Sequence, residues 1–246
     1  MGYKTMDANE AVSRVSYKFT EIAGIYPITP ASPMAEKVDV LASKGEINFW
    51  GNKVKVIEME SEKGAIATVH GALQAGVLAT TYTASQGLLL MIPSIYKMAG
   101  EMLPGVIHVA ARSLSTHSLS IFGDHQDIYA VRQTGACMLS SSSVEEAYHM
   151  AMVSHLASIK SSLPFINFFD GFRTSHEIGK VKEIDLSKLE TLIDKKALRK
   201  FRDNGMISGA TTRGTAENED VYFQHTESRN GYYTKAIDNV IYYMDK

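Results

Sequence analysis

The chain alternates between short apolar runs and longer segments whose apolar residues recur at helical spacing. The apolar runs predict buried strands at residues 22–28, 54–59, 78–84, 104–112, 135–141 and 164–172. The helical spacing predicts helices at 8–20, 32–45, 64–76 and 85–102, and a long helix after residue 143. Short continuous apolar strands that alternate with helices are typical of a parallel sheet covered on both faces. The sequence therefore predicts a doubly wound, mainly parallel α/β fold.

Several helix ends can be predicted from single residues. Ser32 followed by Pro33 predicts an N-cap with proline in the first turn, and Gly45 predicts the end of that helix. Pro93 predicts a kink or interruption inside 85–102. Ser143 predicts the cap of the long helix that precedes the last strand.

The composition changes after about residue 180. Residues 180–204 are highly charged and predict a helix, whereas 205–224 show no clear periodicity. The tail offers no second hydrophobic core. We therefore predict an α/β domain over residues 1–180, followed by a charged helical segment and an extended arm over 181–246. The arm is expected to wrap the domain or to continue toward the next one.

Bulk properties narrow the functional classes. The chain has 246 residues, 45% of them hydrophobic, and a net charge of −2, which argues against a nucleic-acid-binding surface. The apolar run 88–92 is too short to span a bilayer, and the first ten residues lack the apolar core of a secretion signal. We expect a cytoplasmic protein that does not bind a membrane.

Cys137 is the single cysteine. An internal disulfide is therefore impossible, and this chain alone cannot supply a cysteine-based zinc or iron–sulfur site. His70, His108, His117 and His125 lack the spacing of ligands on a helix, so no metal site is expected.

The loops after Ile28, Met59, Ala84 and Ala111 each carry a polar residue. These residues are Thr29, Glu62, Ser85 and Arg112, respectively. Ligands of open parallel sheets bind at the carboxyl ends of the strands, so these positions are candidates for a site. Glu62 is the third of three alternating carboxylates, after Glu58 and Glu60. A carboxylate at the start of a helix can simply interact with the helix dipole, and residue type alone leaves both alternatives open.

Other sequence signals are weak. No glycine-rich phosphate-binding motif is present, and Ser85 lacks the Gly-x-Ser-x-Gly context of a hydrolase nucleophile. The run Asp124–Asp127 could be catalytic, but a polar loop with satisfied hydrogen bonds is the favoured interpretation.

Several long motifs occur in one order along the chain. They are YPITPASPMAE (26–36), EMESEKGAIATVHGALQAG (58–76), TYTASQGLLLMIPSIYKMAGEMLPGVIHVAAR (81–112) and FGDHQDIYAVRQTG (122–135). Together they closely resemble the N-terminal domain, domain I, of pyruvate:ferredoxin (flavodoxin) oxidoreductase. The likeness covers most of residues 3–203, and TRGTAENEDVYFQ (212–224) resembles a later segment of the family, whereas NGMISGATTRG (204–214) fits less well.

The resemblance implies thiamine diphosphate as the cofactor, with its aminopyrimidine end on this domain. Glu62 matches the family's glutamate that bonds the ring nitrogen N1′ and thereby activates the cofactor. Glu58 and Glu60 are then expected to be solvated. Thr29 matches the threonine beside the substrate, and Arg112 matches the arginine that binds its carboxylate.

The resemblance also implies that Tyr26, Pro27 and Ile28 form part of the cofactor pocket wall, although simple packing explains them equally well. The implied reaction converts pyruvate and coenzyme A to acetyl-coenzyme A and CO₂, with electrons passed to ferredoxin or flavodoxin in anaerobic metabolism.

The motifs for the diphosphate-bound Mg²⁺ and for [4Fe-4S] clusters are absent, so both are expected in other domains of the same enzyme. The family resemblance implies that the whole enzyme is a homodimer. The isolated chain is expected to be inactive. The alternatives are the same module of another 2-oxoacid:ferredoxin oxidoreductase, or a catalytically silent interaction domain.

Overall fold

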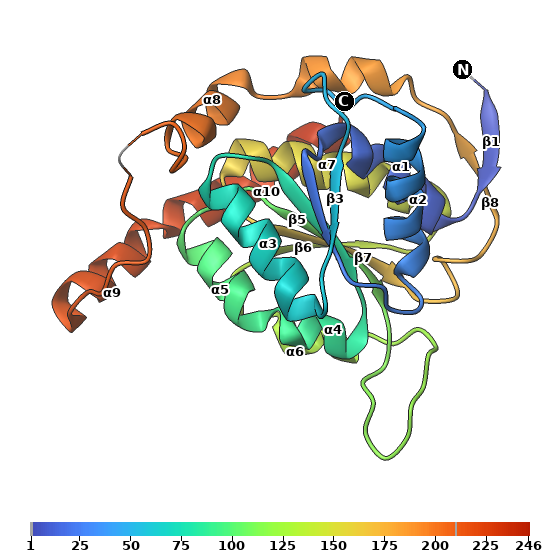
Figure 1. The fold of residues 1–246 in the computed structure, drawn as a ribbon, viewed down its shortest axis with the longest axis horizontal. Coiled ribbons are helices and arrows are strands. Elements are labelled where there is room, and N and C mark those ends of the chain that lie inside the picture. Colours follow the sequence, from blue (N-terminus) through green and yellow to red (C-terminus); the bar gives the residue numbers. More distant parts are fainter. Residues whose placement is uncertain (1, 210) are drawn as a thin grey trace.

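The computed structural model describes residues 2–209 and 211–246 and confirms the α/β class (Figure 1). Its main sheet has six parallel strands in the order β3-β2-β4-β5-β7-β6. The strands are β2 (Ile22–Ile25), β3 (Lys55–Glu58), β4 (Ala79–Thr83), β5 (Val106–Ala111), β6 (Cys137–Ser141) and β7 (Phe165–Asp170). Every residue of the central strands β4 and β5 is buried, which explains their continuous apolar character.

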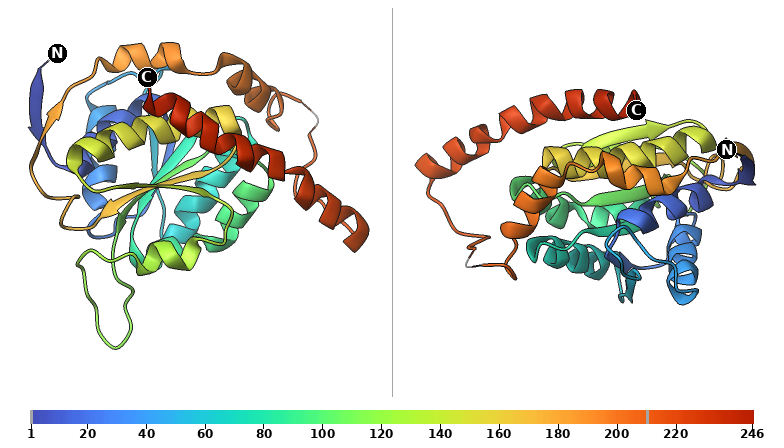
Figure 2. Two further views of the ribbon diagram at one scale, coloured as in Figure 1. Left: turned by 180° about the vertical axis from the view of Figure 1, so that it is seen from behind. Right: turned by 90° about the horizontal axis from the view of Figure 1, so that it is seen from above.

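Helices cover both faces of this sheet (Figure 2). They are α1 (Ala8–Phe19), α2 (Ser32–Ser43), α3 (Glu62–Gln74), α4 (Ser85–Leu90), α5 (Ile92–Gly100), α6 (Gln126–Val131) and α7 (Val144–Ser161). The helix α7 packs on β5, β6 and β7 and against α1, whereas α3 packs on β2 and β4 and against α5. The connections cross from strand to parallel strand, as a doubly wound fold requires.

Most predicted elements are present, with shifted ends. The strand predicted at 22–28 ends at Ile25, and the helix predicted at 64–76 begins two residues earlier, at Glu62. The region 85–102 divides into α4 and α5, with Pro93 in the first turn of α5, where its missing N–H is harmless. The predicted cap role of Ser32 is wrong, because Ala31 occupies the cap position and makes no side-chain cap bond. Ser143 does cap α7, since its hydroxyl accepts from the Glu146 N–H.

Within residues 2–182, two features were not predicted. The strands β1 (Tyr3–Met6) and β8 (Gly179–Lys182) form a separate antiparallel pair, and α6 begins in the polar run that follows the loop after β5. All three elements are only four to six residues long, so periodicity could not reveal them. The predicted boundary between residues 1–180 and 181–246 falls inside β8, which pairs with the first strand. The division into these two parts stays a prediction.

A polar cluster lies inside the apolar core. His108 on β5 stacks on Tyr82, and its Nε2 lies 3.1 Å from Nε2 of His155 on α7. The side-chain amide of Asn167 donates to Nδ1 of His108 at 3.1 Å, so His108 can donate from Nε2 to His155. Complete burial lowers the pKa of His108 to about 3 and holds the pKa of His155 well below its usual value. Both rings are therefore neutral at physiological pH.

Most of the described tail is helical, including much of the segment predicted as an extended arm, and two of its helices pack on the domain. It contains a 3₁₀ helix η1 (Leu186–Leu192), α8 (Lys195–Asp203), α9 (Glu219–Ser228) and α10 (Asn230–Met244). On α8, the Arg202 guanidinium lies 4.8 Å from the centre of the Trp50 ring and 3.3 Å from the Glu21 carboxylate. The helix α10 packs along α7. In contrast, α9 extends away from the domain and buries none of its residues (Figures 1 and 2).

Candidate functional site

The four polar positions predicted after strands lie at one edge of the sheet. They follow β2, β3, β4 and β5, which are neighbours in the order β3-β2-β4-β5. All of these strands are parallel, so their carboxyl ends meet at the same edge. The long loop between β5 and α6 projects beyond the sheet in Figure 1.

The three alternating glutamates have different environments. Glu58 and Glu60 are exposed, whereas Glu62 is only 7% exposed. Glu62 is the first residue of α3, directly after the cap residue Ser61, whose hydroxyl accepts from the Gly64 N–H. None of the ion pairs in the described residues involves Glu62. The structure thus sets one buried carboxyl group apart from two solvated ones.

Gly87 on α4 makes the space that Glu62 occupies. A Cβ atom built on Gly87 would lie 2.7 Å from Glu62 Oε1 and 2.6 Å from Thr83 Oγ1. Thr83 Oγ1 is itself buried and lacks a hydrogen-bond partner among the described residues. A buried carboxyl group beside an unpaired hydroxyl indicates a place where a polar ligand can complete the hydrogen bonding.

Arg112 joins the loops after β5 and β2. Its Nη1 donates to the backbone oxygen of Thr29 at 2.6 Å, so the structure brings these two predicted residues together. Arg112 is only 6% exposed, whereas Thr29 is exposed. Burial lowers the pKa of the Arg112 guanidinium, and the charges of Asp127 and Glu62 act in the opposite direction. Its Nε is buried and has no partner in the described part of the chain, which leaves a donor for a ligand.

Asp127, on α6, connects the starts of two site segments. Its Oδ2 accepts from the backbone N–H groups of Ser85 at 2.8 Å and Arg112 at 3.0 Å, and its Oδ1 accepts from the Ile128 N–H at 2.8 Å. Ser85 is fully buried, and its hydroxyl donates to the backbone oxygen of Ser113. The favoured interpretation of the run 124–127 as a hydrogen-bonded segment agrees with these contacts.

The segment after β2 carries the three residues expected at a pocket wall. Tyr26 and Ile28 are half-buried and Pro27 is exposed. Ile28 packs partly against the hydrophobic core, so packing accounts for at least one of the three. Their contact with a cofactor stays a prediction.

A second polar pair lies on the same edge. His125 Nε2 lies 2.7 Å from Oδ1 of Asp170, which ends β7, and both side chains are partly exposed. In residues 2–209 and 211–246, no three His, Cys, Asp or Glu side chains gather in a way that could hold a metal ion. Within the same residues, no helix is long and apolar enough to cross a membrane.

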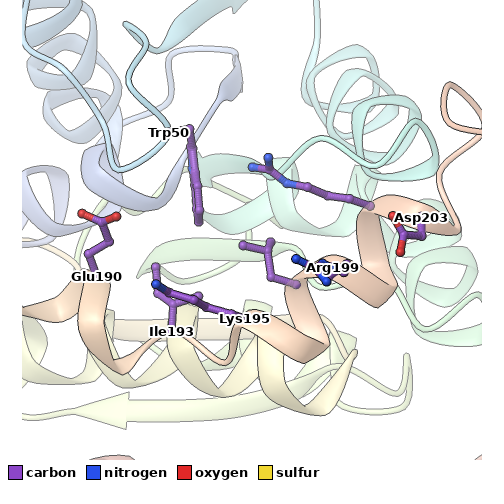
Figure 3. A pocket seen from close by; sticks show the side chains of 8 residues that line it. Trp50, Glu190, Ile193, Lys195, Arg199 and Asp203 are labelled. Carbon is purple, nitrogen blue, oxygen red and sulfur yellow. The ribbon is translucent and has the colours of Figure 1, made fainter.

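A cavity of about 310 Å³ lies elsewhere, between the loop carrying Trp50 and α8 (Figure 3). Trp50 precedes β3, so this cavity belongs to the opposite, amino-terminal edge of the sheet. Its charged lining is mixed, with Glu190 and Asp203 against Lys195, Arg199 and Arg202. It reflects how α8 is fastened to the domain and does not include Glu62 or Arg112.

Sequence reasoning named Glu62, Thr29 and Arg112 as site candidates and did not single out Gly87, Thr83 or Asp127. The only available signal for Asp127 was its place in a polar run, and a glycine in a helix gave no indication that it faces a carboxylate. Together, the buried acid, the guanidinium with a free donor and the parallel sheet define an α/β ligand-binding module with its site at the carboxyl edge.

Comparisons with known proteins agree with this class. Residues 14–245 match the family described as pyruvate flavodoxin/ferredoxin oxidoreductase, thiamine diphosphate-binding. The chain is 57% identical to a pyruvate-flavodoxin oxidoreductase of Klebsiella pneumoniae over 98% of its length, and 55% identical to a pyruvate:ferredoxin oxidoreductase of Moorella thermoacetica over its full length. It covers 21% of each relative.

A solved 2-oxoglutarate:ferredoxin oxidoreductase from Magnetococcus marinus has the same fold, with a TM-score of 0.66 at 22% identity over 76% of this chain and 32% of that one. The chain therefore belongs to the pyruvate flavodoxin/ferredoxin oxidoreductase family, in its thiamine diphosphate-binding domain. It spans about a fifth of the length of the relatives that it matches.

Proposed function

We propose that this domain activates thiamine diphosphate and orients pyruvate within an oxidoreductase about five times its length. The proposed reaction converts pyruvate and coenzyme A to acetyl-coenzyme A, CO₂ and a proton, with two electrons transferred singly to ferredoxin or flavodoxin. The observation that supports it best is the burial of Glu62, alone among the three glutamates, at the edge that also carries Arg112.

Glu62 is suited to hold the aminopyrimidine end of the cofactor. When bound, thiamine diphosphate supplies the carbon nucleophile that attacks the keto group of a 2-oxoacid. The Glu62 carboxyl group would share a proton with ring nitrogen N1′, a weak base that needs a partner shielded from water. Gly87 leaves room for this carboxyl group, and the nearby Thr83 hydroxyl offers a further hydrogen bond.

Arg112 and Thr29 are suited to hold the substrate. A guanidinium binds a carboxylate through paired donors, and one donor of Arg112 is already anchored on Thr29. This anchor leaves Nε for the pyruvate carboxylate, and the hydroxyl of the exposed residue Thr29 would bond the keto oxygen or carboxylate. Tyr26, Pro27 and Ile28 form the adjoining wall of the cofactor pocket.

The remaining chemistry is assigned to other parts of the enzyme. Residues that bind Mg²⁺ with the diphosphate, the [4Fe-4S] clusters and coenzyme A are proposed to lie in further domains, and the whole enzyme is proposed to be a homodimer. The arm over 181–246 leads toward those domains. Exposed apolar side chains on α9, Tyr222 and Phe223, support this arrangement because nothing in the domain covers them.

The test is Glu62→Gln in the full-length enzyme. Glutamine preserves the size of the side chain but cannot share an acidic proton with N1′, so turnover should fall at least about a hundredfold, the lower end of the usual range for acid–base catalysis. Glu58→Gln and Glu60→Gln are matched controls, since both residues are exposed, and they should keep normal turnover. Pyruvate-dependent viologen reduction in the presence of thiamine diphosphate and coenzyme A measures the effect. Unchanged turnover in Glu62→Gln would instead favour a silent interaction domain.

A second candidate function is the same step on another 2-oxoacid, since the enzyme that shares this fold is named for 2-oxoglutarate. Assaying the full-length enzyme with a panel of 2-oxoacids separates the two, and pyruvate should have the highest kcat/KM. Residues 1–246 alone should show no sustained dye reduction, because they lack electron carriers and the rest of the site.

A further inference from the structure

The side chain of Asp127 contacts the backbone at the start of α4 and at the start of the loop after β5. Its Oδ2 accepts from the Ser85 N–H at 2.8 Å and from the Arg112 N–H at 3.0 Å. One oxygen atom therefore fixes the separation of two segments that are 27 residues apart in the sequence, between Ser85 and Arg112. The other oxygen, Oδ1, is fixed by the Ile128 N–H at 2.8 Å.

These contacts are made by a fully buried carboxylate. Asp127 is 0% exposed and takes part in none of the ion pairs among the described residues. Burial raises its pKa, and the backbone N–H groups of Arg112, Ser85 and Ile128 act against this rise. A buried charge is tolerated only when hydrogen bonds replace its contacts with water. The three N–H groups therefore stabilise the Asp127 carboxylate, and the same hydrogen bonds fix the positions of the segments that carry these N–H groups.

Each segment held by Asp127 carries a different part of the proposed site. Ser85 begins α4 with a φ of 52°, a left-handed conformation that is uncommon for residues other than glycine, and two residues later Gly87 borders Glu62. Arg112 directs its guanidinium to Thr29. A shift at Asp127 would therefore move the wall of the Glu62 pocket relative to the guanidinium.

We infer that Asp127 is a positioning residue that sets the place of Arg112 relative to the Glu62 pocket and thereby the binding geometry of the 2-oxoacid. The inference rests on the proposed function, in which Arg112 binds the substrate carboxylate. It assigns no contact with substrate to Asp127, which acts through the backbone of Arg112 and Ser85.

The experiment is a double-mutant cycle in the full-length enzyme. Asp127→Asn retains the shape but replaces one acceptor oxygen by an NH₂ group, which faces a backbone N–H. We expect the KM for pyruvate to rise at least about tenfold, with the KM for coenzyme A unchanged. Asp124→Asn is the matched control: Asp124 lies in the same run, and its Oδ1 accepts only from the Gln126 N–H, so its KM for pyruvate should stay within about twofold of wild type.

If Asp127 serves folding alone, the double-mutant cycle should give other KM values than if Asp127 positions Arg112. If Asp127 acts through Arg112, Asp127→Asn should raise the KM for pyruvate in the wild-type background and have little further effect beside Arg112→Ala. Additive effects in the double variant would overturn the inference. If Asp127→Asn does not accumulate as folded enzyme, Asp127→Glu provides the same test, because it keeps the carboxylate but displaces it by one methylene; its KM should rise at least about threefold, again only when Arg112 is present.

The single variants separate this inference from the function on which it rests. If Arg112→Ala raises the KM for pyruvate but neither Asp127 variant does, the positioning role is wrong and the substrate site stands. If Arg112→Ala leaves the KM for pyruvate unchanged, the proposed substrate site fails and the role of Asp127 fails with it.

Discussion

Gly87→Ala tests the proposed site by adding one methyl group beside Glu62. The new Cβ would lie 2.7 Å from Glu62 Oε1, 2.8 Å from its Cγ and 2.6 Å from Thr83 Oγ1, whereas ordinary contacts begin at 3.4 Å. Glu62 and Thr83 are both buried, so neither can retreat into solvent. The Glu62 carboxyl group must therefore move by about 0.7 Å, or α4 must move away from α3.

A displacement of this size is large for the catalytic role that is proposed for Glu62. Misplacement by about 1 Å can cost about a hundredfold in rate, so we expect kcat to fall between about ten- and a hundredfold. Folding should be affected less, because alanine is favoured over glycine in a helix by about 1 kcal/mol, which offsets part of the steric cost. The variant should therefore lose activity out of proportion to stability.

The assay is pyruvate-dependent viologen reduction by the full-length enzyme, together with its melting temperature. Gly71→Ala is the matched control, since Gly71 lies in the middle of α3 and a Cβ there meets nothing within 4 Å. The control should keep full activity. Wild-type kcat in Gly87→Ala would refute the reasoning that Glu62 must occupy this position.

Two further predictions concern the core and the arm. The pKa of His108 is about 3 in the fold and about 6.5 when unfolded, so its contribution to stability is complete above pH 6.5 and is lost as the pH falls toward 3. The unfolding free energy of residues 1–246 should fall by up to about 1.4 kcal/mol per pH unit in that window for each such histidine, and His108→Gln should reduce this slope in denaturation experiments. On α9, replacing Tyr222 and Phe223 together by serine should lower the melting temperature of the full-length enzyme but not of residues 1–246, because the domain buries neither side chain.

Each of these two predictions has an outcome that would contradict it. An unchanged pH slope in His108→Gln would show that the neutral histidine cluster does not account for acid sensitivity. Equal melting-temperature shifts in the domain and in the full-length enzyme would show that α9 is not covered by another part of the protein.

The main sheet could be predicted because both faces of a parallel strand are buried. The run 104–112, for example, is apolar over nearly its whole length, and the structure buries every residue of β5. The pair β1 and β8 could not be predicted in this way, since Gly179–Lys182 is a short polar segment whose partner lies at the other end of the chain. Its formation depends on the fold bringing residues 179–182 next to the first strand, Tyr3–Met6.

The candidate site, too, has features that the sequence could predict and features that it could not. Motif resemblance selected Glu62, Thr29 and Arg112, and parallel topology placed them at one edge. Neither the motifs nor the parallel topology could show that Glu62 is buried while Glu60, two residues away, is exposed. That difference depends on α4, whose Gly87 approaches Glu62 from a different part of the sequence.

By itself, the sequence determined the α/β class, the strand segments of the main sheet and the family, because hydrophobic periodicity and long motifs are local properties of a chain. Only the tertiary structure decided which carboxyl group is withdrawn from water, that Arg112 is anchored on Thr29, and that Asp127 connects two segments of the site. Burial and hydrogen bonding at this edge depend on strand order and helix packing, which bring together residues that are distant along the chain.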